Sequence, residues 1–169
     1  TITASPVAPG TTGQRTFYAQ SISGGDSVLF NDSASNAAVN VTTAMTPSLI
    51  TVSNVVLSYK IGGAAPITGT GPLVKQGASS LTLSSSNGFS GGSALSAGLV
   101  KIGQDNALGS GQVTLSGSSL SSDSTNARTL ANSFLIAANC TLGNAVNNGI
   151  LTFSGAMDFS NATRAVTIN

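Results

Sequence analysis

Residues 73–120 read LVKQGASSLTLSSSNGFSGGSALSAGLVKIGQDNALGSGQVTLSGSSL. Short segments that alternate apolar and polar residues lie at 81–83, 99–102 and 113–115, and corners rich in glycine and serine separate them. Alternation with a period of two indicates short, half-buried β-strands, and glycine accepts the positive φ angles that tight corners require. Strand cores at Leu83, Ile102 and Leu120 recur every 18 to 19 residues. This recurrence favours a stack of parallel coils over a set of antiparallel hairpins.

The same stretch carries an ordered series of motifs. An L-x-K-x-G-x-x-x-L-T-L pair of strands fills residues 73–83, and an N-x-F-S-G-G turn fills residues 87–92. A second strand pair at 94–103 and an N-A-L-G-x-G corner at 106–111 come before a V-T-L-S-G strand. This series resembles the passenger-associated, or autotransporter-associated, β-strand repeat of bacterial surface and secreted proteins. The resemblance implies a right-handed parallel β-solenoid that lies outside the cell or on the bacterial cell surface.

The rest of the chain continues the pattern. We expect an all-β protein in which residues 1–169 form a single β-solenoid domain of about eight coils, at roughly 20 residues per coil. Residues 25–32 (GDSVLFND) resemble a segment that often precedes this repeat in long bacterial surface proteins. Because the chain begins without an initiator methionine or a signal peptide, we expect a segment or a processed piece of a longer protein. Further strand-like segments lie at residues 15–19, 27–30, 38–42, 49–52, 55–61, 133–136, 140–142, 150–153 and 165–168.

The alternation also predicts which side chains face inward and form the core. Two segments, residues 104–108 and 131–139, are compatible with a turn of helix, but both are short, so a corner and a strand are preferred there. The expected inward residues are Leu81, Leu83, Leu99, Ile102, Val113, Leu115, Leu135, Leu151 and Phe153.

The composition excludes several classes of function. Only 7% of the residues are charged, and the net charge is +1, so the chain lacks the basic face of a nucleic-acid-binding protein. The absence of histidine removes Ser-His-Asp and Cys-His catalysis and most transition-metal sites. No apolar run is long enough for a transmembrane helix. Cys140 is the only cysteine, and a lone cysteine in a strand pattern is usually a small buried apolar residue.

Few residues suggest a site. The five acidic residues are all aspartates, and only Asp26 and Asp32 lie close in sequence, where capping a turn is their expected role. Together with Asn31 they form a weak candidate for a calcium site, since Gly24-Gly25-Asp26 is one incomplete copy of a calcium-binding nonapeptide. No catalytic residue, cofactor site or other metal site is expected.

The leading functional hypothesis is therefore structural. Both ends of the chain have strand-like sequences, at residues 1–3 and 165–169, and we find no polar cap at the C-terminal end. An uncapped solenoid presents open sheet edges that stack end to end, either on another copy of the chain or on adjacent repeats of the same protein. We therefore expect an extracellular rod, stalk or filament with no enzymatic activity. The alternative is an autotransporter-type passenger or adhesin that binds glycans or surfaces, with Phe17, Tyr18 and Tyr59 as possible sugar-stacking rings. A polysaccharide-active β-helix enzyme ranks third.

Overall fold

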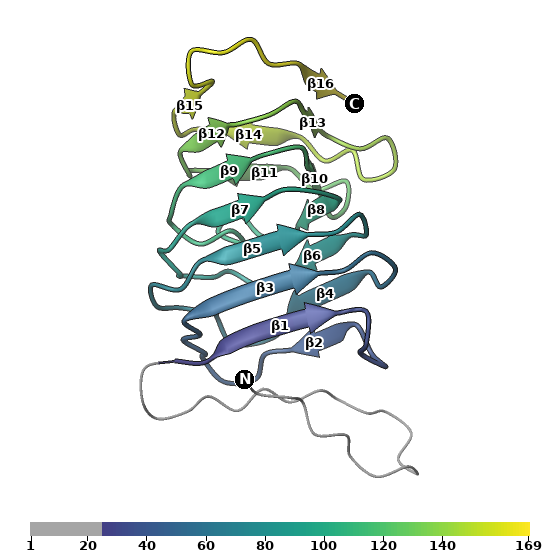
Figure 1. Cartoon of the computed structure of the whole chain (residues 1–169), viewed down its shortest axis with the longest axis vertical. Helices are drawn as coiled ribbons and strands as arrows, with labels where there is room; N and C mark the ends of the chain where they lie inside the picture. The colour runs from purple at the N-terminus through teal and green to yellow at the C-terminus, as the bar shows by residue number, and fades with distance from the viewer. Residues whose placement is uncertain (1–24) are drawn as a thin grey trace.

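A computed structural model describes residues 25–169 of the chain. Two ladders of short strands climb side by side along the molecule and form the faces of a solenoid (Figure 1). Every strand pair is parallel, and the described residues contain no helix, so the all-β parallel solenoid expected from the sequence is confirmed. The first ladder comprises β1 (Ser27–Asn31), β3 (Leu49–Ser53), β5 (Leu73–Gln76), β7 (Ser93–Leu95), β9 (Val113–Leu115), β12 (Phe134–Ile136) and β15 (Met157–Asp158).

The second ladder stacks the alternate strands. It comprises β2 (Ala38–Asn40), β4 (Tyr59–Gly62), β6 (Leu81–Leu83), β8 (Leu99–Ile102), β10 (Ser119–Ser122), β13 (Cys140–Leu142) and β16 (Val166–Ile168). A separate two-stranded sheet pairs β11 (Arg128–Leu130) with β14 (Leu151–Phe153). In Figure 1 the near strands run from left to right while the chain climbs from its N-terminal to its C-terminal side, so the solenoid is right-handed. This is the hand that twisted strands favour in parallel connections.

The stack within residues 25–169 has about six turns, where about eight were expected for residues 1–169. Most of the described turns are longer than the spacing of 18 to 19 residues between the motifs. Leu83 lies beside Ile102, 19 residues later, but Ile50 lies beside Leu73, 23 residues later. The apparent 18-residue step to Leu120 is also wrong, since Leu120 stacks on Val100 and not on Ile102. The corners therefore differ in length from coil to coil, while the strands of neighbouring coils remain paired in parallel.

The core is a column of inward side chains between the two ladders. Leu81, Leu83, Ile102, Val113 and Leu115 are at most 2% exposed, as expected from their alternation. Leu151 and Phe153, in the last coil, are partly buried and pack against this core.

Two of the expected core residues are wrong by one position. Leu99 and Leu135 are only partly buried, whereas Val100, Phe134 and Ile136 are completely buried. Neighbouring residues in these strands are both apolar (Leu99-Val100 in β8 and Phe134-Leu135-Ile136 in β12), so either of them could face inward, and a shift of one residue exchanges the two faces.

The strand boundaries follow the prediction with local changes. The segment at 55–61 starts as a corner with exposed Val55 and Val56, and β4 begins only at Tyr59. The segments at 104–108 and 131–139 are a turn and the strand β12, in place of the helical alternative. The strands β11 and β15 were not predicted from the sequence. The strand predicted at residues 15–19 lies outside the described residues.

Candidate functional site

The coils are tied together by asparagine side chains at the corners. The Asn87 side-chain oxygen accepts a hydrogen bond from the Ile67 backbone N–H at 3.0 Å, and its amide donates to the Ala107 carbonyl at 2.8 Å. One side chain therefore bridges three successive coils. Asn132 donates to the carbonyls of Gly109 and Gly111 at 3.0 and 2.8 Å. Because buried carbonyls need partners, these asparagines stabilise the corners.

Lys75 is the charged group that the sequence interpretation did not single out. Its side chain is completely buried inside the solenoid, and its Nζ donates to the carbonyls of Gln76, Gly77 and Ala97 at 2.8, 2.7 and 3.3 Å. Burial lowers the pKa of Lys75 to about 8. Three carbonyls match the three N–H donors of an ammonium group, so Lys75 closes a corner as an internal polar clamp. The signal was present in the sequence, because Leu73 and Lys75 share one face of a strand.

The residues of the weak calcium candidate make hydrogen bonds to other parts of the fold. The Asp32 carboxylate accepts backbone N–H bonds from Val55, Val56 and Leu57 at 2.7 to 3.1 Å. Because these N–H donors stabilise the charged form, they lower the pKa of Asp32. The Asn31 side-chain oxygen accepts from the N–H and hydroxyl of Ser33.

Asp32 thus anchors the next corner of the solenoid. Its carboxylate faces backbone N–H donors, whereas the carboxylate of a calcium ligand faces the cation. The Asp26 carbonyl accepts from the Ser48 N–H at 3.1 Å, in the strand ladder. No group of three or more histidine, cysteine, aspartate or glutamate side chains within residues 25–169 is arranged to hold a metal ion.

Of the three aromatic residues considered for sugar stacking, the structure describes only Tyr59. Its ring is 2% exposed and packs against Phe30 with 5.4 Å between the ring centroids. Its hydroxyl donates to the Asn31 carbonyl at 2.6 Å. Burial raises the pKa of Tyr59 above its ordinary value. Tyr59 is therefore a core residue, and Phe17 and Tyr18 lie outside the described residues.

The charges of the β11 corner are also engaged locally. Arg128 donates to the Asp123 carboxylate at 3.1 Å and to the Ile102 carbonyl at 3.3 Å. The Asp105 carboxylate accepts from the Thr129 N–H at 3.1 Å. These bonds hold the two-stranded β11–β14 sheet against the main stack. Burial raises the pKa of the Cys140 thiol, which is 5% exposed, so the thiol is protonated and unreactive at neutral pH.

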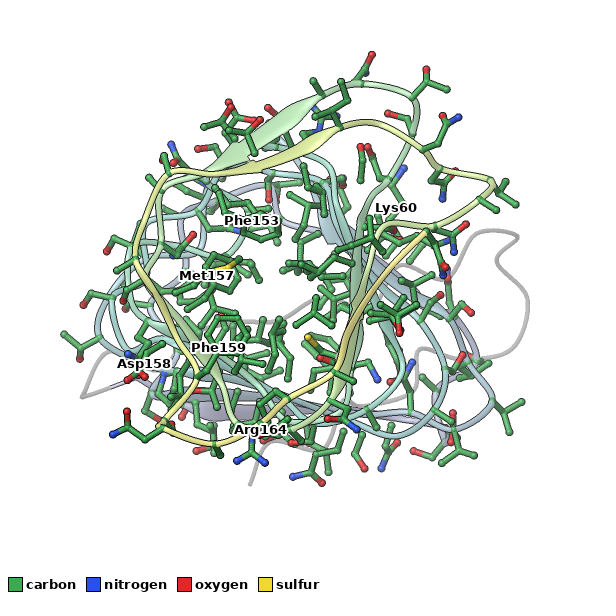
Figure 2. All side chains as sticks on the ribbon, turned by 90° about the horizontal axis from the view of Figure 1, so that it is seen from above. Lys60, Phe153, Met157, Asp158, Phe159 and Arg164 are labelled. Carbon is green, nitrogen blue, oxygen red and sulfur yellow. The ribbon has the colours of Figure 1, made fainter. Side chains whose placement is uncertain are left out.

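The C-terminal end of the solenoid is a largely apolar face. Figure 2 looks onto it and shows Phe153 and Met157 turned toward the axis, with Asp158 and Arg164 turned outward. Phe153 packs edge-on against Phe134 of the coil below, with 5.0 Å between the ring centroids. Phe159 and Ile168 are 40% and 72% exposed. Side chains that would be covered by a further coil are thus open on this end.

One of three comparisons with known proteins found a match, and it agrees with the architecture. No curated protein and no solved structure shows significant similarity to the chain. No helix within residues 25–169 is long and apolar enough to cross a membrane. The family model of the passenger-associated-transport-repeat matches residues 73–102, which comprise β5 to β8 and the corner clamped by Lys75. The repeat and the solenoid fit a passenger-like domain of an autotransporter. Residues 73–102 of this chain are thus similar to the passenger-associated-transport-repeat.

Proposed function

We propose that this chain is a structural segment of an extracellular bacterial solenoid, without catalytic activity, which extends end to end as a rod, stalk or filament. The observation that carries the proposal is the unbroken parallel register of the two ladders along the described stack. The inward side chains of the last described coil, which contains β15 and β16, are covered on one side only.

The continuity of the ladders supports extension. Strands stay in parallel register from β1 to β15 and from β2 to β16, so one more coil on β15 and β16 would prolong both sheets and the apolar column between them. The edge of each terminal strand presents backbone groups that another strand can satisfy. A head-to-tail contact of this kind does not close on itself and yields a fibre.

The low content of charged residues in the chain also supports end-to-end extension. Exposed sheet edges are commonly protected by charged side chains, and only 7% of this chain is charged. Covering apolar surface yields about 25 cal/mol per Å², which offsets part of the entropy lost on association. The passenger-associated repeat supports an extracellular or surface location, because its description places it in transported passengers.

Association at the end face is tested by the variant Val166→Lys. Val166 lies in β16 and packs against the core, so a lysine there places a charge in the proposed contact. We expect the unmodified chain to grow in size with concentration, both in sedimentation velocity and in electron micrographs. Val166→Lys should remain monomeric.

Thr167→Lys is the matched control, because Thr167 lies in the same strand and is exposed. It adds the same charge away from the apolar column and should associate as the unmodified chain does. An unmodified chain that stays monomeric at millimolar concentration would contradict the proposal. Equal loss of association in both variants would assign the effect to net charge instead of the end face.

A further inference from the structure

The chain contains two Asn-Gly pairs, at residues 87–88 and 148–149. An asparagine followed by glycine is especially prone to deamidation, because glycine has no side chain to shield its backbone nitrogen. That nitrogen attacks the side-chain amide of the preceding asparagine, so the reaction also requires the amide to turn toward it. The fold decides whether the amide is free to do so.

The side-chain amide of Asn87 is held in place. Its Oδ1 accepts the N–H of Ile67 at 3.0 Å, and its Nδ2 donates to the Ala107 carbonyl at 2.8 Å. Asn87 is only 7% exposed. Turning its amide toward Gly88 would break both bonds and leave buried polar groups without partners, which is unfavourable.

The side-chain amide of Asn148 is free. Asn148 is exposed, and its side chain makes no hydrogen bond within residues 25–169. It lies in the corner of residues 143–150, between β13 and β14, which projects from the side of the stack in Figure 1. The Asn148 side chain can therefore rotate toward the next residue without losing a hydrogen bond.

The attacking nitrogen does not distinguish the two pairs. Gly88 donates its N–H to the Ile67 carbonyl at 2.8 Å, and Gly149 donates its N–H to the Ser124 carbonyl at 3.0 Å. Each of these bonds must open before the nitrogen reacts. The difference between the pairs thus lies in the asparagine side chain.

We propose that Asn148 is a site of spontaneous deamidation in the folded chain, whereas Asn87 is protected. The Gly149 nitrogen gives up its proton to solvent and forms a bond to Cγ of Asn148. The bond from Cγ to Nδ2 then breaks, and ammonia leaves with a proton taken from solvent. Water opens the resulting cyclic imide at either carbonyl, which gives aspartate or isoaspartate. Both products add a carboxylate to the corner, and isoaspartate also adds one carbon to the backbone.

The lengthened backbone acts on the link to the coil below. Gly149 is buried, and a Cβ added there would meet the Asn126 carbonyl. An extra backbone carbon directly before Gly149 therefore has to displace this residue. The displacement breaks the bond from the Gly149 N–H to Ser124. Formation of isoaspartate thus releases the corner, and it does so irreversibly.

Peptide mapping by mass spectrometry tests the proposal on the full-length chain, incubated at mildly alkaline pH. In the folded chain, we expect Asn148 to convert at least about tenfold faster than Asn87, since a protected group reacts only on local opening. In concentrated urea, which removes the contacts of Asn87, the two rates should agree within about twofold. The denatured chain thus supplies the intrinsic rate of each pair.

Asn148→Gln is the matched variant. It keeps an exposed amide, but its longer side chain would have to close a larger and less favourable ring. After incubation, ion exchange separates the converted chain by its added charge. We expect the Gly149 amide to exchange hydrogen at least about tenfold faster in the isoaspartate form than before incubation. Incubated Asn148→Gln should be unchanged, and the amides of β8 serve as the internal reference.

Four results would overturn the inference. Equal conversion of both asparagines in the folded chain would show that the bonds of Asn87 give no protection. Conversion of Asn148 at least about tenfold slower in the folded chain than in urea would show that the Ser124 bond holds Gly149 unreactive. Unequal rates in urea would assign the difference to the local sequence. Unchanged exchange of the Gly149 amide in the isoaspartate form would refute the release of the corner.

The experiment is independent of end-to-end association. It follows single residues in the dilute chain and leaves Val166 unaltered, so this inference and the proposed function fail separately.

Discussion

Two strands of the same ladder share one sequence pattern and differ in what surrounds them. In β6, Leu81-Thr82-Leu83 lies between β4 and β8, and its leucines are 0% and 2% exposed. In β16, Val166-Thr167-Ile168 pairs with β13 alone; Val166 is partly buried and Ile168 is 72% exposed. An alternating triplet therefore becomes core only where a coil covers it on both sides. The difference teaches that burial in this fold is a property of the stack, as expected for solenoids.

The corners differ between the same two regions. In the middle coils, the positive φ angles of the corners fall on glycines, among them Gly77 at 80° and Gly98 at 72°. In the last described coil, Ser160 and Asn161 adopt φ angles of 53° and 51°. Left-handed backbone costs a residue with a side chain roughly 1–2 kcal/mol. The middle coils are thus relaxed at their corners, whereas the terminal coil carries local strain.

The largest expected effect comes from truncating the same ladder at its middle and at its end. Leu83→Ala should lower the free energy of unfolding by about 2–5 kcal/mol, the usual range for a buried leucine. Ile168→Ala should lower it by less than about 0.5 kcal/mol, because that side chain is mostly exposed. Urea denaturation followed by circular dichroism measures both. Similar costs for the two variants would break the comparison between covered and uncovered coils.

The second effect concerns the buried ammonium of Lys75, which is stacked between Val52 of β3 and Leu95 of β7. Its folded pKa of about 8 lies below the ordinary value of 10.5, so between these values the unfolded chain binds the proton that the folded chain has lost. Stability contributed by this group should therefore rise from about pH 8 to about pH 10.5, by up to about 3 kcal/mol, and be flat below pH 8. The measurement is the difference in unfolding free energy between the unmodified chain and Lys75→Met across this pH range.

The difference cancels the titration of every other group, which is why the variant is needed as a reference. A flat difference from pH 8 to pH 10.5 would mean that the three carbonyl acceptors at Nζ hold the ammonium as strongly as water does. The middle of the stack would then tolerate a charge at no net cost.

The smallest effect tests the corners with two glycines of the same repeat. At Gly77 the φ angle is 80° and an added Cβ would meet the Asn54 backbone carbonyl, so Gly77→Ala should cost about 2 kcal/mol or more through strain and displacement. At Gly88 the nearest atom is Thr68 Cγ2 at 3.5 Å, and φ is not positive. Gly88→Ala should therefore change stability by at most about 0.5 kcal/mol. Thermal unfolding midpoints distinguish the two, and equal shifts would contradict the assignment of strain to the left-handed corners.

Much of the fold could be predicted from the sequence because its signals are local. The alternation in Leu81-Thr82-Leu83 and Val113-Thr114-Leu115 names both the strand and its inward face, and the structure confirms them. The prediction failed at Leu99 and Leu135, where apolar residues occupy both faces of a short strand. Which face turns inward there depends on the register with the neighbouring coils, a non-local property that alternation does not encode.

The candidate site was likewise predicted only in part from the sequence. Asp32 was expected to cap a turn, and the structure places it on the N–H groups of the next corner. Lys75 and Asn87 make hydrogen bonds to residues that lie 20 to 22 positions away in the sequence. No local sequence pattern therefore identified these links between coils. Their roles follow from the stacking distance between coils.

The sequence by itself determined the class of structure: a parallel β-solenoid with few charges and glycine corners. The right-handed coil was implied by the resemblance of residues 73–120 to the passenger-associated repeat. Periodicity, turn chemistry and composition carry that information, and each is readable within some twenty residues. The tertiary structure alone decided which face of the ambiguous strands turns inward, the burial of Lys75 and the exposure of the C-terminal face. These depend on which residues become neighbours across coils, because side chains are buried and hydrogen bonds satisfied by the coil above and the coil below.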